Sequence, residues 1–593
     1  MAIRFFGRAL GMRAPIAVFL CALSVALGAC GAPPKLTAPG GLKPSAGVGA
    51  VVSEHPEATR VGLEILDAGG NAIDAAVATA LALAVVYPQA GNLGGGGFAV
   101  VVPAGAAEEA VTLDFRETAP AKLTAADFRD ENDDVIPGLS TDTHLGVGVP
   151  GSPDGLWRLH ERFGLLEWDA LVSPAIRLAR EGFAVDPHLA RDLRASGLRE
   201  RLSRSSAARA LFYPDGEPLA EGERLVQPEL ARTLELLAAQ GPDGFYRGPV
   251  ADALTAEMRR AKGRLEQTDL DDYTSTWREP VVGEFDGFQV ISMPPPSSGG
   301  VALLQVLGMV ERLDPPRSSS GPSGPVAHLW AEAMRRAFAD RAMHLGDPDF
   351  VDVPVAELLS PAWLDERAEG LGSQADLEVE PWARPPAEGG GETTHLSVLD
   401  AEGNAVSLTT TLNTTFGTGI LVPGAGFLLN NELDDFSLKP GVPNAYGLVG
   451  QAANQIEGGK RPLSSMTPTV LLDDQGRVRM VVGSPGGPRI ISSVLQVVLR
   501  HVWHGQPIAE AIEAPRLHQQ WRPLSTRLEP GWSPAVLSDL EERGHELDLR
   551  SSRWSSVQGI TVDAQGRVAA HSDSRRGGAA GVQGQGLSQP ARP

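Results

Sequence analysis

The stretch Gly389–Val398 reads GGGETTHLSV and sets three glycines and one glutamate directly before the pair Thr393–Thr394. Glycine adopts many backbone conformations, so we expect the peptide before Thr393 to be accessible. One interpretation is a surface turn that enters a strand. The other is that the chain is cut before Thr393, because a threonine hydroxyl is a weak nucleophile that its own α-amine, with an unperturbed pKa of about 7.7–8.0, can activate.

The residues on either side of this stretch differ in pattern. Residues 365–392 are polar, rich in Gly, Pro and Glu, and lack periodicity, which predicts a long loop. Strands and helices are expected on both sides of it, so we predict strands sandwiched between helical layers. The expected strands are Phe98–Val102, Thr394–Leu399, Ala405–Leu412, Gly426–Leu429, Thr467–Leu472 and Arg479–Val482, and the expected helices are Asn71–Tyr87, several amphipathic ones within 157–260, and two near 489–504 and 506–513.

The first 29 residues have the features of a processing signal. Arg4, Arg8 and Arg13 precede an apolar run, APIAVFLCALSVALGA, that is short for a membrane span and ends in small residues. Leu27–Cys30 resembles a bacterial lipobox, in which the cysteine is lipidated and becomes the mature N-terminus. The alternative is an ordinary secretory signal that happens to end near a cysteine. Residues 30–48, rich in Gly, Pro and Ala, are then a flexible tether.

Composition excludes several function classes. The formal net charge of -22 argues against a nucleic-acid partner and against docking on anionic lipid by charge. Cys21 and Cys30 are the two cysteines, and both lie in the signal region. A cysteine nucleophile, an iron–sulfur cluster and a cysteine-bound zinc in the mature body are therefore excluded.

Familiar catalytic motifs are missing from the sequence. It contains no G-x-S-x-G elbow and no H-E-x-x-H helix, and its twelve histidines lack metal-ligand spacing. The glycine-rich run GNLGGGG at Gly91–Gly97 lacks the order of a dinucleotide or P-loop motif, so close backbone packing is its expected role. A threonine nucleophile remains, but one threonine after a glycine run is weak evidence by itself.

Many longer motifs strengthen the case for a threonine nucleophile. They include GNAIDAA (70–76), PQAGNLGGGGF (88–98), DFRE (114–117), MPPPSSGG (293–300), ADRAMHLGDPDF (339–350), TTHLSV (393–398), TLNTTFGTG (411–419), LNNELDDFS (429–437), PGVPNAYGLVG (440–450), KRPLSSM (460–466) and GSPGG (483–487). With these motifs the sequence resembles the γ-glutamyltransferases (glutathione hydrolases), a family of N-terminal-nucleophile hydrolases, from about Val51 to Arg575.

The resemblance implies a four-layer αββα sandwich and a precursor that cuts itself between Glu392 and Thr393. The products would be a large subunit, 49–392 after the tether, and a small catalytic subunit, 393–593, held together as a heterodimer. Residues 575–593, rich in Gly, Gln and Ser, are expected to be disordered. No metal and no organic cofactor is implied.

The resemblance also assigns roles to site residues. Thr393 is the nucleophile, Thr411 a hydrogen-bonding neighbour, and the N–H groups of Gly486 and Gly487 stabilise the oxyanion. The substrate's α-carboxylate would meet Arg116, Ser464 and Ser465. Its α-ammonium would meet Asp435, Glu432 and Asn413. Tyr446 would close a lid, residues 440–451, by bonding to Asn413.

Two residues depart from the family pattern. Glu392 precedes the cut where Asp or Asn is more usual, but this residue contributes only its carbonyl, so processing should survive. Ser572–Arg575 reads SDSR in place of SDPR, which is expected to loosen a terminal turn.

The predicted function is transfer of a γ-glutamyl group from glutathione or a related compound to water, an amino acid or a short peptide. The protein would be extracytoplasmic, anchored through a lipid on Cys30, on the periplasmic face of the outer membrane. Two alternatives stay open: an amide acylase of the same fold, acting on cephalosporin or glutaryl side chains, and a non-catalytic lipoprotein that binds γ-glutamyl compounds or peptides.

Overall fold

The computed structural model describes residues 47–377 and 391–589, which belong to the unit Lys35–Pro593. The predicted signal peptide, Cys30 and the tether up to residue 46 lie outside the described residues, as do residues 378–390 before the predicted cut. Within the described ranges, no helix combines the length and apolar character that crossing a bilayer requires.

The larger sheet in the described residues is antiparallel and carries Thr393 on a central strand. Its order is β19-β18-β1-β9-β10-β2-β3-β6. The strands are β1 (Ala50–Ser53), β2 (Gly96–Val102), β3 (Val111–Phe115), β6 (Thr276–Arg278), β9 (Gly391–Leu399), β10 (Ala405–Thr414), β18 (Ala579–Val582) and β19 (Gly586–Ser588). Strands from both predicted subunits therefore pair with one another across this sheet.

The second main sheet packs face to face with the first. Its order is β17-β16-β12-β11-β8-β7, also antiparallel. Apolar side chains such as Val100, Leu399, Val470 and Ile560 fill the space between the two sheets. The strands are β7 (Val281–Phe285), β8 (Phe288–Ser292), β11 (Thr469–Leu472), β12 (Val478–Gly483), β16 (Gln558–Val562) and β17 (Val568–Ser572).

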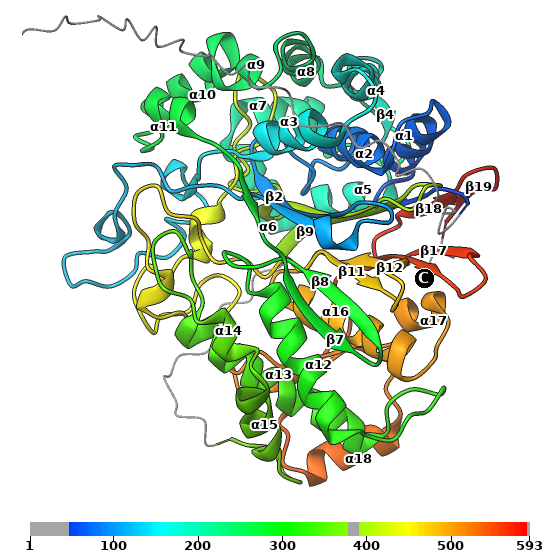
Figure 1. Ribbon diagram of the computed structural model, residues 1–593. Coiled ribbons are helices and arrows are strands. Elements are labelled where there is room, and N and C mark those ends of the chain that lie inside the picture. The colour runs from blue at the N-terminus through cyan, green and yellow to red at the C-terminus, as the bar shows by residue number, and fades with distance from the viewer. Residues whose placement is uncertain (1–46, 378–390, 590–593) are drawn as a thin grey trace, which may run out of the picture. The chain divides into compact units, whose positions relative to one another are not determined.

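Helices cover the outer face of each sheet, so the predicted four-layer αββα sandwich is confirmed (Figure 1). On the first sheet lie α1 (Pro56–Asp67), α2 (Ala72–Val86) and α3 (Ser152–Phe163), with α4 (Trp168–Glu181) and α8 (Pro228–Gln240) further out. On the second sheet lie α12 (Gly299–Leu313), α16 (Arg489–Val498) and α17 (Ile508–Glu513), with α13 (Gly324–His344) packed on α12.

Smaller elements complete the layers. The amphipathic helices expected within 157–260 are present, and two small sheets lie outside the main ones. The remaining helices are α5 (Pro187–Arg194), α6 (Ser196–Arg204), α7 (Ser206–Phe212), α9 (Asp243–Tyr246), α10 (Gly248–Arg260), α11 (Gln267–Asp272), α14 (Val355–Leu358), α15 (Pro361–Glu369) and α18 (Pro534–Glu542); the small sheets hold β4 (Phe183–Ala184) with β5 (Arg224–Leu225), and β13 (Leu517–His518), β14 (Thr526–Leu528) and β15 (Leu547–Leu549).

Side chains of β9 alternate between the two faces of the first sheet, as strand geometry requires. Leu396 and Val398 face the helical layer and join its apolar core. Thr393 and His395 face the second sheet, where the His395 ring packs against Gly483 so closely that a Cβ there would lie 2.2 Å from it. The register of β9 thus directs Thr393 away from the helices and toward the space between the sheets.

The glycine-rich run before β2 serves close packing, as predicted. A Cβ on Gly95 would lie 2.1 Å from the carbonyl oxygen of Thr411 on β10. Asn92 donates a hydrogen bond to the same carbonyl at 2.9 Å. These contacts hold β10, the strand beside the predicted nucleophile, against the loop that precedes β2.

One predicted strand is wrong. Gly426–Leu429 pairs only through a single bridge, Leu421 with Leu428, and does not form a strand. Gly426 has a φ of +77°, and a Cβ there would lie 2.3 Å from Leu230 N. The apolar residues are buried because the loop packs on α8, and the sequence pattern reflects that burial instead of a β-ladder.

The prediction of disorder after residue 575 is wrong for residues 575–589. Ala579–Val582 pair with β1 as β18, and Gly586–Ser588 pair with β18 as β19. Gly581 packs against Leu63, to which a Cβ would come within 2.4 Å. Small residues that resemble a flexible tail are needed here for close contact with α1.

Hydrogen bonds hold the terminal turn at Ser574, where the family pattern has proline. Ser574 N donates to Glu513 Oε1 at 2.9 Å, and Ser574 Oγ donates to Glu513 Oε2 at 2.6 Å. Proline has no backbone N–H and no hydroxyl, so it could form neither bond. The serine replaces the stiffness of proline with two hydrogen bonds to a carboxylate.

Candidate active site

Thr393 and Thr411 are opposite each other on β9 and β10. Their hydroxyl oxygens are 3.2 Å apart, and the N–H of Asn413 donates to Thr411 Oγ1 at 2.8 Å. Both threonines are buried. Two backbone strands and a backbone hydrogen bond therefore fix where the Thr393 hydroxyl lies.

The end of β10 is distorted at the site. The register with β9 shifts between Thr411 and Thr414, and Asn413 has a φ of +76°, in the left-handed region that asparagine tolerates better than most residues. Asn413 Nδ2 donates to the carbonyl of Asn431 at 2.9 Å. The bulge thus directs Asn413 into the same pocket as Thr393.

One pocket gathers the residues that the sequence predicted. Ten of the predicted site residues line it, and Gly486 is the neighbour of a lining residue without lining the pocket itself. The lining residues are Arg116, Thr393, Thr411, Asn413, Glu432, Asp435, Tyr446, Leu448, Ser464, Ser465, Met466, Gly487, Pro488 and Ile490. The pocket has a charged end and an apolar wall, with Thr393 among its lining residues.

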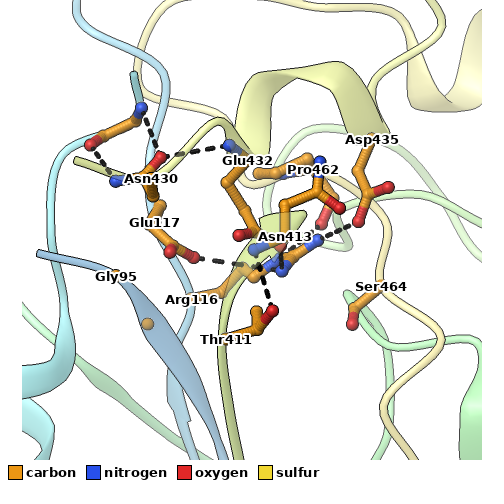
Figure 2. Close-up of polar contacts among 12 residues, drawn as sticks. Gly95, Arg116, Glu117, Thr411, Asn413, Asn430, Glu432, Asp435, Pro462 and Ser464 are labelled. Carbon is orange, nitrogen blue, oxygen red and sulfur yellow. Dashed lines mark hydrogen bonds and ion pairs between the residues drawn. The ribbon is translucent and has the colours of Figure 1, made fainter. Parts of the chain in front are cut away.

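Arg116 is the centre of the charged end (Figure 2). Its guanidinium, fully buried, donates to Glu432, to Asp435 Oδ2 at 2.6 Å and to the carbonyl of Pro462 at 3.2 Å. Burial opposes the arginine's charge, but the carboxylates outweigh it and raise the pKa of Arg116. Arg116 is therefore a permanent cation held by two carboxylates.

The carboxylates themselves are destabilised by burial. Burial raises the pKa of Glu432 to about 8, although Arg116 opposes the shift. It also raises the pKa of Asp435, again against the effect of Arg116. Removing charged groups from water is costly, so a second cation in the pocket would be stabilised strongly by these acids.

Glu117 is a buried acid that sequence reasoning missed. Its nearer oxygen is 3.9 Å from Arg116 Nη1, and neither carboxylate oxygen has a hydrogen-bond partner among the described residues. Burial, followed by the charge of Glu432, raises the pKa of Glu117 well above its usual range. One guanidinium cannot neutralise three carboxylates, so we infer that Glu117 carries a proton. The sequence feature that could have identified Glu117 is its place in the motif DFRE, next to Arg116.

The predicted lid lies over this pocket. Tyr446 Oη donates to the backbone carbonyl of Asn413 at 2.6 Å. Asn444 Nδ2 donates to Asp435 Oδ1 at 3.3 Å, and Ala445 N donates to Asp434 Oδ2 at 2.9 Å. The lid is thus tied to the acids that precede it in sequence as well as to β10. Leu448 of the same loop contributes to the apolar wall, together with Met466, Pro488 and Ile490.

The glycine pair after β12 has positive φ values and two backbone N–H groups. Gly486 and Gly487 have φ values of +129° and +59°. A Cβ on Gly486 would lie 2.1 Å from Ser555 Oγ, and one on Gly487 would lie 2.9 Å from the Tyr446 ring. Within residues 47–377 and 391–589, neither backbone N–H donates to another protein group. Two donors therefore remain available beside the pocket.

The two serines have different surroundings. Ser464 Oγ accepts a hydrogen bond from Met466 N at 3.1 Å, and its carbonyl accepts from Ser298. Ser465 lines the pocket beside it. The bridge between Ser297 and Ser464 joins this loop to the segment that leads into α12. A backbone N–H thus orients the Ser464 hydroxyl, and Ser465 lines the same pocket as Arg116.

An αββα sandwich with a threonine near the start of a central strand, in one pocket with Gly487, is the arrangement of an N-terminal-nucleophile hydrolase. A family model described as gamma-glutamyltranspeptidase matches residues 58–583. The chain belongs to the γ-glutamyltranspeptidase family, and it is an enzyme with the transferase and hydrolase activity of that family.

Individual relatives agree with this assignment. The glutathione hydrolase proenzyme of Escherichia coli (strain K12) is 45% identical over 534 residues, 89% of this chain and 90% of the relative. The cephalosporin acylase structure from Bacillus halodurans superimposes with a TM-score of 0.79 at 28% identity, covering 93% of this chain and 98% of that one. The γ-glutamyltranspeptidase structure from Helicobacter pylori has a TM-score of 0.52 at 40% identity, covering 57% of this chain and 94% of that one.

Proposed function

We propose that this enzyme cuts itself between Glu392 and Thr393 and then uses Thr393 to transfer the γ-glutamyl group of glutathione and related amides. The observation that carries the proposal is the single pocket in which the Thr393 hydroxyl meets a buried cation and buried carboxylates. A γ-glutamyl group ends in a free amino acid, with one carboxylate and one ammonium. Such a zwitterion matches that set of charges.

Self-cleavage would begin with attack of Thr393 Oγ1 on the carbonyl carbon of Glu392. The C–N bond then breaks, the threonine nitrogen takes up a proton, and Glu392 is left as an ester on Thr393. Water hydrolyses the ester, which leaves a carboxylate on Glu392 and a free α-amine on Thr393. Thr411, 3.2 Å from the hydroxyl, orients it for this step.

In turnover the α-amine would accept the proton of its own hydroxyl while Oγ1 attacks the γ-carbonyl of the substrate. Gly486 and Gly487 would donate to the oxyanion. Arg116, with Ser464 and Ser465, would hold the substrate's α-carboxylate, and Glu432, Asp435 and Asn413 its ammonium. The amine product leaves with a proton, and water or the amine of an amino acid or peptide takes the γ-glutamyl group from Thr393.

The Thr393→Ala variant tests the assignment. Wild-type protein should give two fragments on denaturing electrophoresis, and the smaller should begin with Thr393. Thr393→Ala should stay as one chain near 62.4 kDa, less any signal peptide, and should not hydrolyse γ-glutamyl-p-nitroanilide. Turnover retained by the variant, or a small fragment that begins at another residue, would contradict the proposal.

Substrate class is tested against the acylase alternative. Tyr446 closes over the pocket through its bond to Asn413, which leaves less room for a bulky side chain. We expect γ-glutamyl-p-nitroanilide to be a better substrate than glutaryl-p-nitroanilide by kcat/KM. The reverse order would favour an acylase, and binding without turnover of either would favour a non-catalytic protein.

We also propose that Cys30 is lipidated and anchors the protein on the periplasmic face of the outer membrane. Support comes from the lipobox-like Leu27–Cys30 and from Gly31 in place of an aspartate. Cys30→Ser should move the protein from the membrane fraction to the soluble fraction and abolish incorporation of labelled palmitate. Unchanged fractionation and labelling would refute lipidation at this residue.

A further inference from the structure

Arg576, which does not line the substrate pocket, contacts the predicted nucleophile Thr393. Arg576 Nη1 donates to the backbone carbonyl of Thr393 at 3.2 Å. The same nitrogen lies 3.6 Å from Glu54 Oε2, and the exposed fractions of the two side chains are 9% and 0%. Arg576 follows β17 and Glu54 follows β1, so two distant parts of the chain bring a buried ion pair to the first residue of the predicted small subunit.

We propose that Arg576 is a positioning residue for the α-amine of Thr393, and that Glu54 balances the effect of its charge on that amine. The inference rests on the proposed role of Thr393 as an N-terminal nucleophile. In the mature enzyme the amine must be neutral in order to accept a proton from its own hydroxyl. The groups that set the pKa of this amine therefore set the pH range in which the enzyme is active.

The geometry places Arg576 within electrostatic reach of the amine. The carbonyl oxygen and the nitrogen of one residue are at most about 3.6 Å apart, so Arg576 Nη1 lies within roughly 7 Å of Thr393 N. A nearby cation disfavours the protonated amine and lowers its pKa. Glu54 has the opposite effect. Arg576 and Glu54 thus shift the pKa of the same amine in opposite directions.

Other ionisable groups also lie near this point. His395, on β9 itself, and His188, on α5, are buried, and burial lowers the pKa of each to about 3, so both are neutral near pH 7. The charge of Arg576 contributes to the shift of His188. Among the described residues, Asp186 pairs with His55 at the start of α1, and Arg116 pairs with Glu432 and Asp435 in the pocket.

The hydrogen bond also has a mechanical role. A strand that begins with a freshly cut end tends to fray, because its first residue loses the restraint of the preceding peptide. Thr393 keeps its pairing with Thr411, and Arg576 holds its carbonyl from the other side. The arginine therefore restrains the residue whose amine and hydroxyl must face each other.

The test uses fully processed enzyme and the pH profile of kcat/KM for γ-glutamyl-p-nitroanilide. Arg576→Met should move the acid limb about one pH unit higher and lower kcat, because the cation and the bond are both lost. Arg576→Lys should keep the limb near its wild-type position while lowering kcat. Glu54→Gln should move the limb lower, because the cation is then unbalanced. A structural defect would lower kcat without shifts of opposite sign.

Arg191→Met is the matched control, because Arg191 also faces His188 but lies 63% exposed and does not contact Thr393. Its acid limb should not move. Acid limbs that stay in place, or that move the same way in Arg576→Met and Glu54→Gln, would overturn the inference. If Arg576→Met does not fold or process, Glu54→Gln decides. A small fragment lacking Thr393 at its N-terminus in the wild type would instead refute the proposed function.

Discussion

Replacement of Arg116 by lysine tests the charged end of the pocket most directly. Arg116 donates in three directions, to Glu432, to Asp435 and to the carbonyl of Pro462. A lysine ammonium is a compact charge on a flexible stem and cannot reproduce a planar fork. With substrate bound, we expect Arg116→Lys to lose at least one charge-assisted hydrogen bond to the α-carboxylate, worth about 1.5–3 kcal/mol.

That loss corresponds to a fall of roughly 10- to 150-fold in kcat/KM for γ-glutamyl-p-nitroanilide. A second substrate isolates the cause. In 4-aminobutyryl-p-nitroanilide the ammonium is kept and the carboxylate is absent, so the wild type should prefer the γ-glutamyl compound by about the same factor. In Arg116→Lys this preference should shrink toward unity. The ratio is independent of how much of the variant is folded.

Arg341→Lys is the control for this experiment. Arg341 is also buried and donates to Ser298 Oγ at 2.9 Å, but it does not line the pocket. It should keep the wild-type preference between the two substrates. If Arg116→Lys lowers kcat/KM for both substrates by the same factor, then Arg116 does not bind the α-carboxylate and its role is to hold Glu432 and Asp435 in place.

Three further predictions concern other parts of the site. Tyr446→Phe removes a buried hydrogen bond to Asn413, so KM should rise about 2- to 10-fold with little change in kcat; a fall in kcat with unchanged KM would refute a lid role. Gly486→Ala places a Cβ 2.1 Å from Ser555 Oγ at a φ of +129°, so kcat should fall by about 100-fold or more, and near-normal kcat would exclude these N–H groups as oxyanion donors. Burial raises the pKa of Glu117, so the folded chain binds more protons than the unfolded chain between about pH 4.3 and the raised folded-state pKa, and wild-type Tm should fall as pH rises through that window. Glu117→Gln should flatten that fall, whereas parallel Tm curves would show that Glu117 is already ionised.

The strand that carries the site could be predicted because its signals are local. Alternation of His395 and Ser397 with Leu396 and Val398 specifies β9, and Ala405–Leu412 specifies its partner. The roles of Arg116 and Asp435, which are far apart in sequence, came from family motifs, since nothing local indicates that they meet. The structure adds how they meet, with one guanidinium donating to both Glu432 and Asp435.

The sequence predictions that the structure contradicts share a physical cause. Composition cannot distinguish small residues that are flexible from small residues that allow close contact. Gly581 and Ala580 were assigned to a disordered tail, yet they pair with β1 and pack on α1. Gly426–Leu429 was assigned to a strand because it is apolar, yet its burial comes from contact with α8. Arg576 was missed for a related reason, because its contact with Thr393 depends on tertiary packing alone.

The balance of charge predicts that this pocket accepts a γ-glutamyl group better than a glutaryl group. Arg116 faces Glu432 and Asp435, and because burial raises the pKa of Glu432 to about 8, a bound ammonium would favour ionisation of Glu432 whereas a bound carboxylate would disfavour it. A γ-glutamyl group brings one ammonium, which would pair with these acids, and one carboxylate, which would pair with Arg116. A glutaryl group brings only a carboxylate, which would add a further buried negative charge beside two acids. An acylase that accepts glutaryl amides would need to remove or neutralise one of these acids, whereas the proposed binding of a γ-glutamyl ammonium depends on both.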